Sequence, residues 1–257
     1  MTRPGWIEPS WPAPPGIRAL STSRQGGASV GLYASLNLGD HVGDDPDAVR
    51  KNRQWLVVAA NLPSTPVWLR QVHGVAVAKN PQQPDCEADA AMTDQTGQVC
   101  AVLTADCLPI LLCDRRGSRV AAVHAGWRGL AAGIIEATIR HLDVAPPTLL
   151  AWLGPAIGPD YFEVGAEVRA AFVACHADAA LAFYPTPEGR WLADLFTLAR
   201  QTLATCGVTA VYGGGLCTAS DPSRFFSHRR DRGVTGRMAS LIWIESHGGA
   251  HPDPRAG

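Results

Sequence analysis

Three residues at the ends of predicted strands have the right types to bind a metal ion. Cys107 lies in TADCLPILL, where Pro109 interrupts an otherwise apolar strand, and His124 ends the next predicted strand. His73 lies in QVHG, at a break in an earlier predicted strand. Two imidazoles and one thiolate, with a fourth position open, are typical of a catalytic zinc site. The same donors would also accept copper, which usually binds such ligands more tightly.

The same side chains offer a second chemistry that needs no metal. Cys107 would then be a nucleophile, and His124 or His73 would be its base. The spacing of the three residues matches no short metal-binding pattern, so residue types and spacing leave both alternatives open. On a strand, Asp106 would point away from Cys107, so we expect it to satisfy backbone groups or to orient a neighbour.

Three segments contain residues that could face an anionic substrate. HAGWRGLAAG places Arg128 at a glycine turn before a helix, where free N–H groups attract anions, although the glycines would also allow tight packing alone. The polar loops STSRQGGAS and SLNLGDHVGDD contain Arg24, Asn37 and His41, which fits either a substrate-facing loop or a solvated one. RFFSHRRDRGVTGR (224–237) contains five arginines, among them Arg229, which either bind phosphate or form a solvated face.

The segments around these residues alternate between helical and extended patterns. We expect a helix over 45–60, with Asp45 as N-cap and Pro46 in its first turn, and further helices over 129–142, 167–176 and 192–206. We expect strands over 67–78 (interrupted at Gly74), 98–114, 119–126, 148–154, 208–216 and 239–245.

This alternation indicates an α/β fold, and the hairpin over 108–124 makes the sheet mixed. Since no Pro/Gly/Ser linker divides residues 17–245, we predict a single layered domain whose mixed β-sheet is flanked by helices. An irregular N-terminal segment (1–16) and a C-terminal tail (246–257) would flank this catalytic domain.

The composition excludes several classes of protein. The formal net charge of the 257-residue chain is −1, so no global field attracts nucleic acid or an acidic membrane. The apolar runs are too short for a membrane-spanning helix, and no signal peptide is recognisable. The seven cysteines form no CxxC pair, which favours reduced thiols and a cytoplasmic location.

Six motifs together resemble one family. They are QVHG, ADA (88–90), TADCLPILL, VHAGWRG, LGPAIGPDYFEVG and DPSRFFSHRRDRGVTGRMAS. Their order is similar to that in the bacterial multicopper polyphenol oxidase (laccase)-like proteins, also called YfiH-type purine nucleoside phosphorylases. The resemblance runs from about residue 17 to 245. It departs at Asp160, where many relatives have Cys, and at His228, where Tyr is common.

The resemblance implies a fold, a metal and an activity. It implies the α/β fold shared with cysteine hydrolases of the cytotoxic-necrotizing-factor type, and a zinc ion held by His73, Cys107 and His124. It also implies phosphorolysis of adenosine, inosine and methylthioadenosine to the free base, together with deamination of adenosine to inosine. The expected partners are a purine nucleoside and phosphate, bound by a monomer or a small homo-oligomer.

These reactions would need a proton carrier and an anion site. Asp106, Asp89 and Glu163 are the candidate carboxylates. Arg24, Arg128 and the arginines at 229–232 are candidates for phosphate, and we group Arg24, Asn37, Asp89, Arg128 and Arg229 as substrate-binding.

Two other activities remain open from sequence. One is an amidase that edits peptidoglycan precursors with the same Cys/His site. The other is a laccase-like polyphenol oxidase with copper at that site. Eight histidines without any HxH pair are too few for a four-copper oxidase, so oxidase activity would be secondary.

Overall fold

A six-stranded mixed sheet forms the centre of the protein. The computed structural model describes residues 5–245, so residues 1–4 and the predicted tail over 246–257 lie outside the described residues. The strand order in this sheet is β11-β7-β5-β6-β3-β2. Only the two outer pairs, β11 with β7 and β2 with β3, are parallel. The strands are β2 (Val77–Lys79), β3 (Ala90–Thr93), β5 (Leu108–Asp114), β6 (Val120–Ala125), β7 (Leu149–Leu153) and β11 (Ala210–Gly213).

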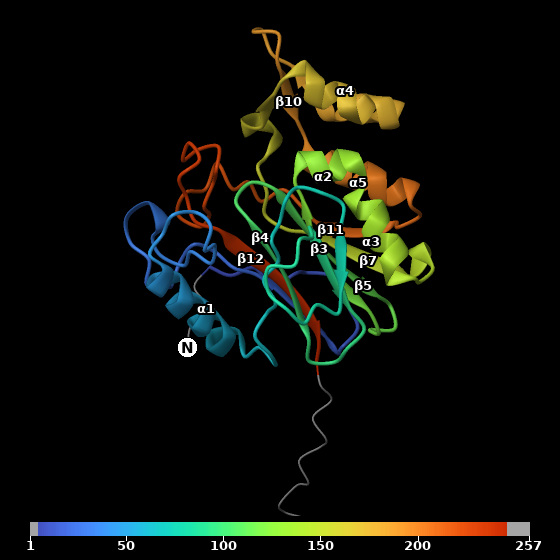
Figure 1. Ribbon diagram of the computed structural model, residues 1–257. Coiled ribbons are helices and arrows are strands. Elements are labelled where there is room, and N and C mark those ends of the chain that lie inside the picture. The colour runs from blue at the N-terminus through green and yellow to red at the C-terminus, as the bar shows by residue number, and fades with distance from the viewer. Residues whose placement is uncertain (1–4, 246–257) are drawn as a thin grey trace, which may run out of the picture.

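The central strands are apolar on both faces because both faces of this sheet are covered. Along β5, Leu108, Ile110 and Leu112 pack toward the helices, whereas Leu111 and Cys113 pack toward a second sheet. Figure 1 shows α2, α3 and α5 lying over one face. A strand buried on both sides shows a continuous apolar run instead of alternation.

The second sheet has three strands and packs against the other face. Its order is β1-β12-β4, from β1 (Ile17–Ser21), β12 (Met238–Ile244) and β4 (Val99–Thr104), and both pairs are antiparallel. The expectation of one strand over 98–114 is therefore wrong. Residues 105–107 form a turn that takes the chain from β4 in the small sheet to β5 in the large one.

Helix α1 (Pro46–Ala60) covers the outer face of the small sheet (Figure 1). The expected start is confirmed, since the Asp45 side chain accepts a hydrogen bond from the backbone of Asp47 and Pro46 begins the helix. The expected helix over 129–142 is instead two helices, α2 (Trp127–Ala132) and α3 (Ile134–Leu142). Gly133 separates them with a φ of 101°, a conformation that glycine adopts without strain.

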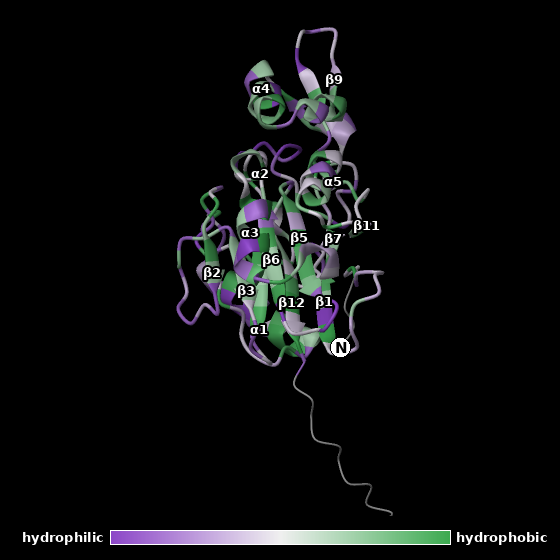
Figure 2. Cartoon of the chain, turned by 90° about the vertical axis from the view of Figure 1, so that its right-hand side faces the viewer, coloured by the Kyte–Doolittle hydropathy of each residue, from purple (hydrophilic) through white to green (hydrophobic). Residues whose placement is uncertain are grey.

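The remaining elements form a lobe that projects beyond the large sheet (Figures 1 and 2). It contains a third sheet, of order β8-β10-β9, and helix α4 (Ala166–Cys175), and α5 (Leu195–Thr205) leads the chain back to the large sheet. The strands of this sheet are β8 (Glu163–Val164), β9 (Phe183–Pro185) and β10 (Trp191–Ala193). The expected helix over 192–206 begins only at Leu195, because 191–193 is strand and Asp194 caps the helix.

The expected strand over 67–78 is mostly irregular. Only β2, from Val77 to Lys79, forms part of a sheet there, and Arg70 makes a single bridge with Glu87. The loop that contains His73 therefore depends on side-chain contacts for its shape. Within residues 5–245, we find no helix with the length and apolar character needed to span a membrane.

Candidate metal centre and substrate pocket

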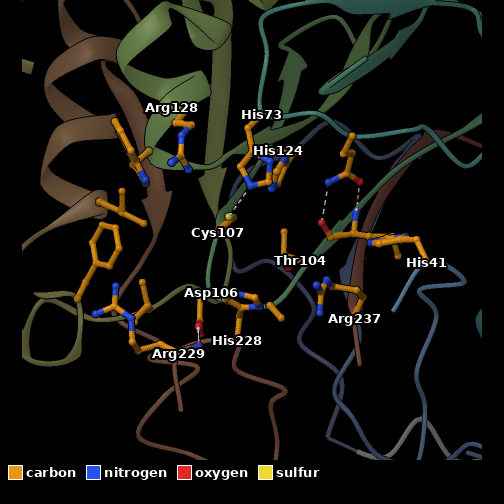
Figure 3. A pocket seen from close by; sticks show the side chains of 17 residues that line it. His41, His73, Thr104, Asp106, Cys107, His124, Arg128, His228, Arg229 and Arg237 are labelled. Carbon is orange, nitrogen blue, oxygen red and sulfur yellow. Dashed lines mark hydrogen bonds between the residues drawn. The ribbon is translucent and has the colours of Figure 1, made fainter. Parts of the chain in front are cut away.

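The structure brings His73, Cys107 and His124 together. Nε2 of His73 lies 3.7 Å from Sγ of Cys107, and one donor atom from each residue lies within 4.8 Å of the others. The two imidazole rings meet edge to face, with centroids 4.8 Å apart. Figure 3 shows the three side chains converging from separate chain segments. No other group of three such side chains with ligand geometry occurs among residues 5–245.

Cys107 is placed by the turn between the two sheets. Asp106 adopts a φ of 87°, and β5 begins directly after Cys107. Pro109 does not end the pairing, contrary to expectation, because it lies opposite His124 in the regular register of β5 and β6. The strand break that the sequence suggested at Pro109 therefore falls three residues earlier, where the chain changes sheets.

Asp106 joins this turn by hydrogen bonds to the segment over residues 218–229. Its carboxylate accepts hydrogen bonds from the Thr218 hydroxyl (2.5 Å), the Ser227 hydroxyl (3.0 Å) and the backbone N–H of Arg229 (2.7 Å). Its backbone carbonyl accepts from the N–H of Ile157. Asp106 thus orients neighbouring segments, as expected, and its acceptor sites are occupied.

Asp89 is fully buried behind the histidines and does not line the pocket. One carboxylate oxygen lies 2.8 Å from Nδ1 of His124 and 2.9 Å from the backbone nitrogen of His73. The other accepts from the backbone of Gly74 (2.6 Å) and Val72 (3.2 Å). Asp89, which the sequence suggested as substrate-binding, therefore lies outside the pocket lining, and backbone donors and an imidazole occupy both of its oxygens.

The electrostatics of the three side chains favour a deprotonated sulfur. Burial alone would raise the pKa of Cys107, but the charge of His124 and hydrogen bonds from both histidines lower it to about 6. Burial would likewise lower the pKa of His124, yet the Cys107 sulfur and the Asp89 carboxylate raise it to about 9. Without a metal, the pair is therefore a thiolate beside an imidazolium.

The donor set fits a zinc ion. Tetrahedral bonds of about 2.3 Å to sulfur and 2.0–2.1 Å to nitrogen would place sulfur and nitrogen donors roughly 3.6 Å apart. The observed separation between His73 and Cys107 is 3.7 Å. His124 presents Nε2, since its Nδ1 faces Asp89. Three donors from the chain leave the fourth position to water or substrate.

Two glycines of HAGWRG make room for this arrangement. A Cβ on Gly126 would lie 2.6 Å from the His73 ring and 3.1 Å from Sγ of Cys107. A Cβ on Gly129 would lie 2.9 Å from the backbone carbonyl oxygen of Gly74. The motif therefore accommodates the metal site and the His73 loop, in addition to turning the chain from β6 into α2.

The three side chains open into a cavity of about 370 Å³. Its lining includes the apolar and aromatic side chains of Phe162, Ile157, Leu195 and Trp127. Figure 3 shows His41 and Arg237 across the three central side chains from Arg128 and Arg229, which lie over Trp127 and Phe162. A body with an apolar ring and a polar or anionic end would match these two sides.

Three arginines line the cavity without a carboxylate partner within the described part of the chain. Arg128 stacks on Trp127, and Arg229 lies over Phe162. Arg237 donates from Nη1 to two backbone carbonyls, leaving Nε and Nη2 without a hydrogen-bond partner among residues 5–245. Other arginines, such as Arg53, Arg190 and Arg230, are paired with carboxylates outside this site.

Other candidates lie outside the cavity. Arg24 stacks on Phe226 and donates to two backbone carbonyls. Asn37 is buried and accepts a hydrogen bond from the backbone of Arg237, so it supports a pocket residue. Glu163 pairs with Arg190 at 2.6 Å. Neither Arg24, Asn37 nor Glu163 lines the pocket.

Of the two departures from the family pattern, His228 lines the cavity and Asp160 does not. His41, from the polar loop that the sequence offered as substrate-facing, lines the cavity, whereas Arg237 was predicted only as one member of an arginine cluster. The position of Arg237 directly before an apolar strand was the available signal, because strand ends place side chains at sheet edges.

Comparison with known proteins identifies the family. The family described as multi-copper polyphenol oxidoreductase laccase matches residues 18–245. The chain belongs to this family. It is 55% identical to a purine nucleoside phosphorylase of Pseudomonas aeruginosa over 241 residues, covering 93% of this chain and 98% of the relative. It is 54% identical over 240 residues to the purine nucleoside phosphorylase YfiH of Escherichia coli, with the same coverage.

Two solved structures share the fold. A Neisseria meningitidis protein superposes with a TM-score of 0.89 at 49% identity, covering 94% of this chain and all of that one (100%). YlmD from Geobacillus stearothermophilus gives a TM-score of 0.90 at 33% identity, covering 96% and 98%. The mixed α/β architecture is thus the family's own, and similarity to cytotoxic-necrotizing-factor hydrolases stays a prediction.

Proposed function

We propose that this protein is a metal-dependent purine nucleoside phosphorylase, with residues 17–245 as its single catalytic domain. The observation that carries the proposal is the pocket: a Cys/His/His donor set lies between an aromatic side and Arg237, which lacks a carboxylate partner among residues 5–245. The names of the relatives from Pseudomonas aeruginosa and Escherichia coli support the same activity. The substrates we propose are adenosine, inosine and methylthioadenosine.

Phosphorolysis makes specific demands on this pocket. A phosphate oxygen forms a bond to C1′ of the ribose as the C1′–N9 bond breaks. The base leaves with the bonding electron pair and takes up a proton, and the sugar becomes ribose 1-phosphate. Arg237 would hold the phosphate, because a guanidinium without a carboxylate partner binds this anion well. Arg128 and Arg229 lie over Trp127 and Phe162, on the side where the base would bind. The base would lie against Phe162 and Ile157.

The metal we propose is zinc, held by His73, Cys107 and His124. When bound there, it would supply a Lewis acid beside the substrate. Copper at the same single site would account for a secondary laccase-like activity. Deamination of adenosine would need a proton carrier, and we assign this role to His41 or His228. Both line the pocket, whereas Asp89 and Glu163 do not and the oxygens of Asp106 accept three hydrogen bonds.

The test is a steady-state assay of the purified zinc-loaded protein with inosine, with and without phosphate. Base release should depend on phosphate, and equal conversion without it would refute phosphorolysis. Arg237→Gln should raise the KM for phosphate about 10-fold or more, as expected when a charge-assisted hydrogen bond is lost, with little change in the KM for inosine. Arg200→Gln is the matched control, since Arg200 also bonds only carbonyls but lies outside the pocket.

A second candidate is the amidase that edits peptidoglycan precursors. The observation that favours it is a chain of side-chain contacts from Cys107 to His124 and from His124 to Asp89. A nucleophile, its base and the acid that orients the base are connected in the same way. Chelation separates the two. A metal-free protein that cleaves a muropeptide amide would support the thiol mechanism, whereas loss of all activity on chelation would exclude it. Cytoplasmic location and a monomer or small oligomer remain predictions.

A further inference from the structure

The Asp89 carboxylate is hydrogen-bonded both to the His124 ring and to the backbone of the loop that contains His73. It lies directly before β3 and is 0% exposed. Its backbone carbonyl also accepts from the N–H of His124, at 2.7 Å. Three backbone donors and one imidazole nitrogen surround its carboxylate. This arrangement lies outside the substrate pocket, so it serves the site without contacting substrate.

The contact with His124 determines which nitrogen faces the metal. A carboxylate only accepts hydrogen bonds, so Nδ1 of His124 must carry the proton at a separation of 2.8 Å. The lone pair of the neutral imidazole is then on Nε2, the atom that faces Cys107. A partner that donated to Nδ1 instead would move the proton to Nε2 and remove this ligand.

The contacts with the His73 loop determine where the second ligand lies. His73 has a φ of 61°, which is uncommon for a residue other than glycine, and its loop has no strand or helix between residues 70 and 76. Three consecutive N–H groups, of Val72, His73 and Gly74, converge on the Asp89 carboxylate. Gln71 adds two hydrogen bonds to Leu103. The loop therefore folds around Asp89.

We propose that Asp89 is the positioning residue of the metal centre: one buried carboxylate sets both the His73 loop and the tautomer of His124. The inference rests on the metal site of the proposed function. It assigns to a single side chain the orientation of one ligand loop and the protonation of the other ligand, both of which are tasks of outer partners in metal sites.

Asparagine is the sharpest replacement, because it keeps the shape and changes a single acceptor into a donor. If the amide oxygen keeps the Val72 and Gly74 donors, the NH₂ group faces both the His73 N–H and Nδ1 of His124. His124 then takes the wrong tautomer. If the amide is reversed, the NH₂ group faces the N–H groups of Val72 and Gly74, and the loop loses its anchor. Neither orientation satisfies both histidines.

The experiment measures zinc affinity of the full chain by competition with a chromophoric chelator. Asp89→Asn should bind zinc about 10- to 100-fold more weakly, the range for lost outer partners. Asp114→Asn is the matched control. Asp114 is also buried and accepts from the backbone of Ser118 and Arg119, but at the far end of β5. Its variant should bind zinc within about threefold of the wild type.

A second measurement needs no variant that might misfold. With ¹⁵N-labelled histidine in the zinc-loaded wild type, NMR should show His124 protonated at Nδ1 and ligated through Nε2. Ligation through Nδ1, or an Asp89→Asn variant with wild-type affinity, would overturn the inference while leaving the metal site intact. A wild type that binds no zinc would overturn the proposed metal site as well.

Discussion

Replacing Gly126 with alanine should remove the proposed metal site while leaving the fold in place. The added Cβ would lie 2.6 Å from Cδ2 and 3.3 Å from Nε2 of His73, and 3.1 Å from Sγ of Cys107. Carbon atoms in contact normally lie about 3.5–4.0 Å apart, so the His73 ring must move by roughly 1 Å. Metal–ligand distances tolerate only about ±0.2 Å. His73 would therefore cease to be a ligand.

We expect zinc affinity to fall about 100-fold, which corresponds to roughly 2.7 kcal/mol of binding free energy. The backbone itself accepts alanine, because Gly126 has a φ of −64° and a ψ of 156°. The free energy of unfolding of the metal-free protein should therefore change by only about 1 kcal/mol, mainly from the weaker helix cap. Chelator competition measures the first quantity and urea denaturation the second.

Gly74→Ala, in the loop that contains His73, is the control. Its Cβ would meet the Asp89 carboxylate at 3.5 Å and Val72 at 3.6 Å, which are ordinary contacts. This variant should bind zinc nearly as the wild type does. If Gly126→Ala also binds zinc within about threefold of the wild type, the reasoning from space around His73 is refuted.

Three further outcomes follow from the pocket and its supports. In the metal-free protein, alkylation of Cys107 should be half-maximal near pH 6, because its thiolate forms there. Cys100, whose pKa is raised by burial, should stay unlabelled. Mass spectrometry of the labelled peptides measures both, and a midpoint for Cys107 at the ordinary value of about 8.5 would contradict the expectation. Asp106→Ala should lower the free energy of unfolding by about 2–4 kcal/mol in urea, because Thr218, Ser227 and Arg229 lose a buried charged acceptor, and an unchanged urea midpoint would count against that. Burial opposes the ionisation of Asp89, but hydrogen bonds from His124 and the loop hold its pKa below the ordinary value. Its contribution to stability should therefore be complete above about pH 4 and be lost as the pH falls through the lower folded-state pKa, so urea midpoints at pH 5 and pH 3 should differ more in the wild type than in Asp89→Asn.

Local signals in the sequence correctly predicted several helices and strands. The cap at Asp45, the hairpin over 108–124 and the strand over 148–154 all have such signals, and all three occur. The change of sheet at residues 105–107 has none. Because both sheets are buried on both faces, β4 and β5 read as one apolar run.

The site was less predictable than the fold, because its supports are distant in sequence. Residue types singled out Cys107, His73 and His124, but only the family resemblance favoured a metal over a catalytic thiol. Asp89 and Asp106 were candidate proton carriers, since nothing local shows that their acceptor sites are occupied. Their partners lie 15 to 35 residues away for Asp89 and more than 100 away for Asp106.

The order of strands in the small sheet has a consequence for biosynthesis. β12 lies between β1 and β4, so its two neighbours have no partner in that sheet until residues 238–244 have left the ribosome. Pairings that join Ile17 to Ile244 are among the least local a chain of this size can make, and such contacts form slowly. The turn that carries Cys107 continues from β4. A nascent chain therefore completes the support of its thiol last, after all three candidate ligands have already been made.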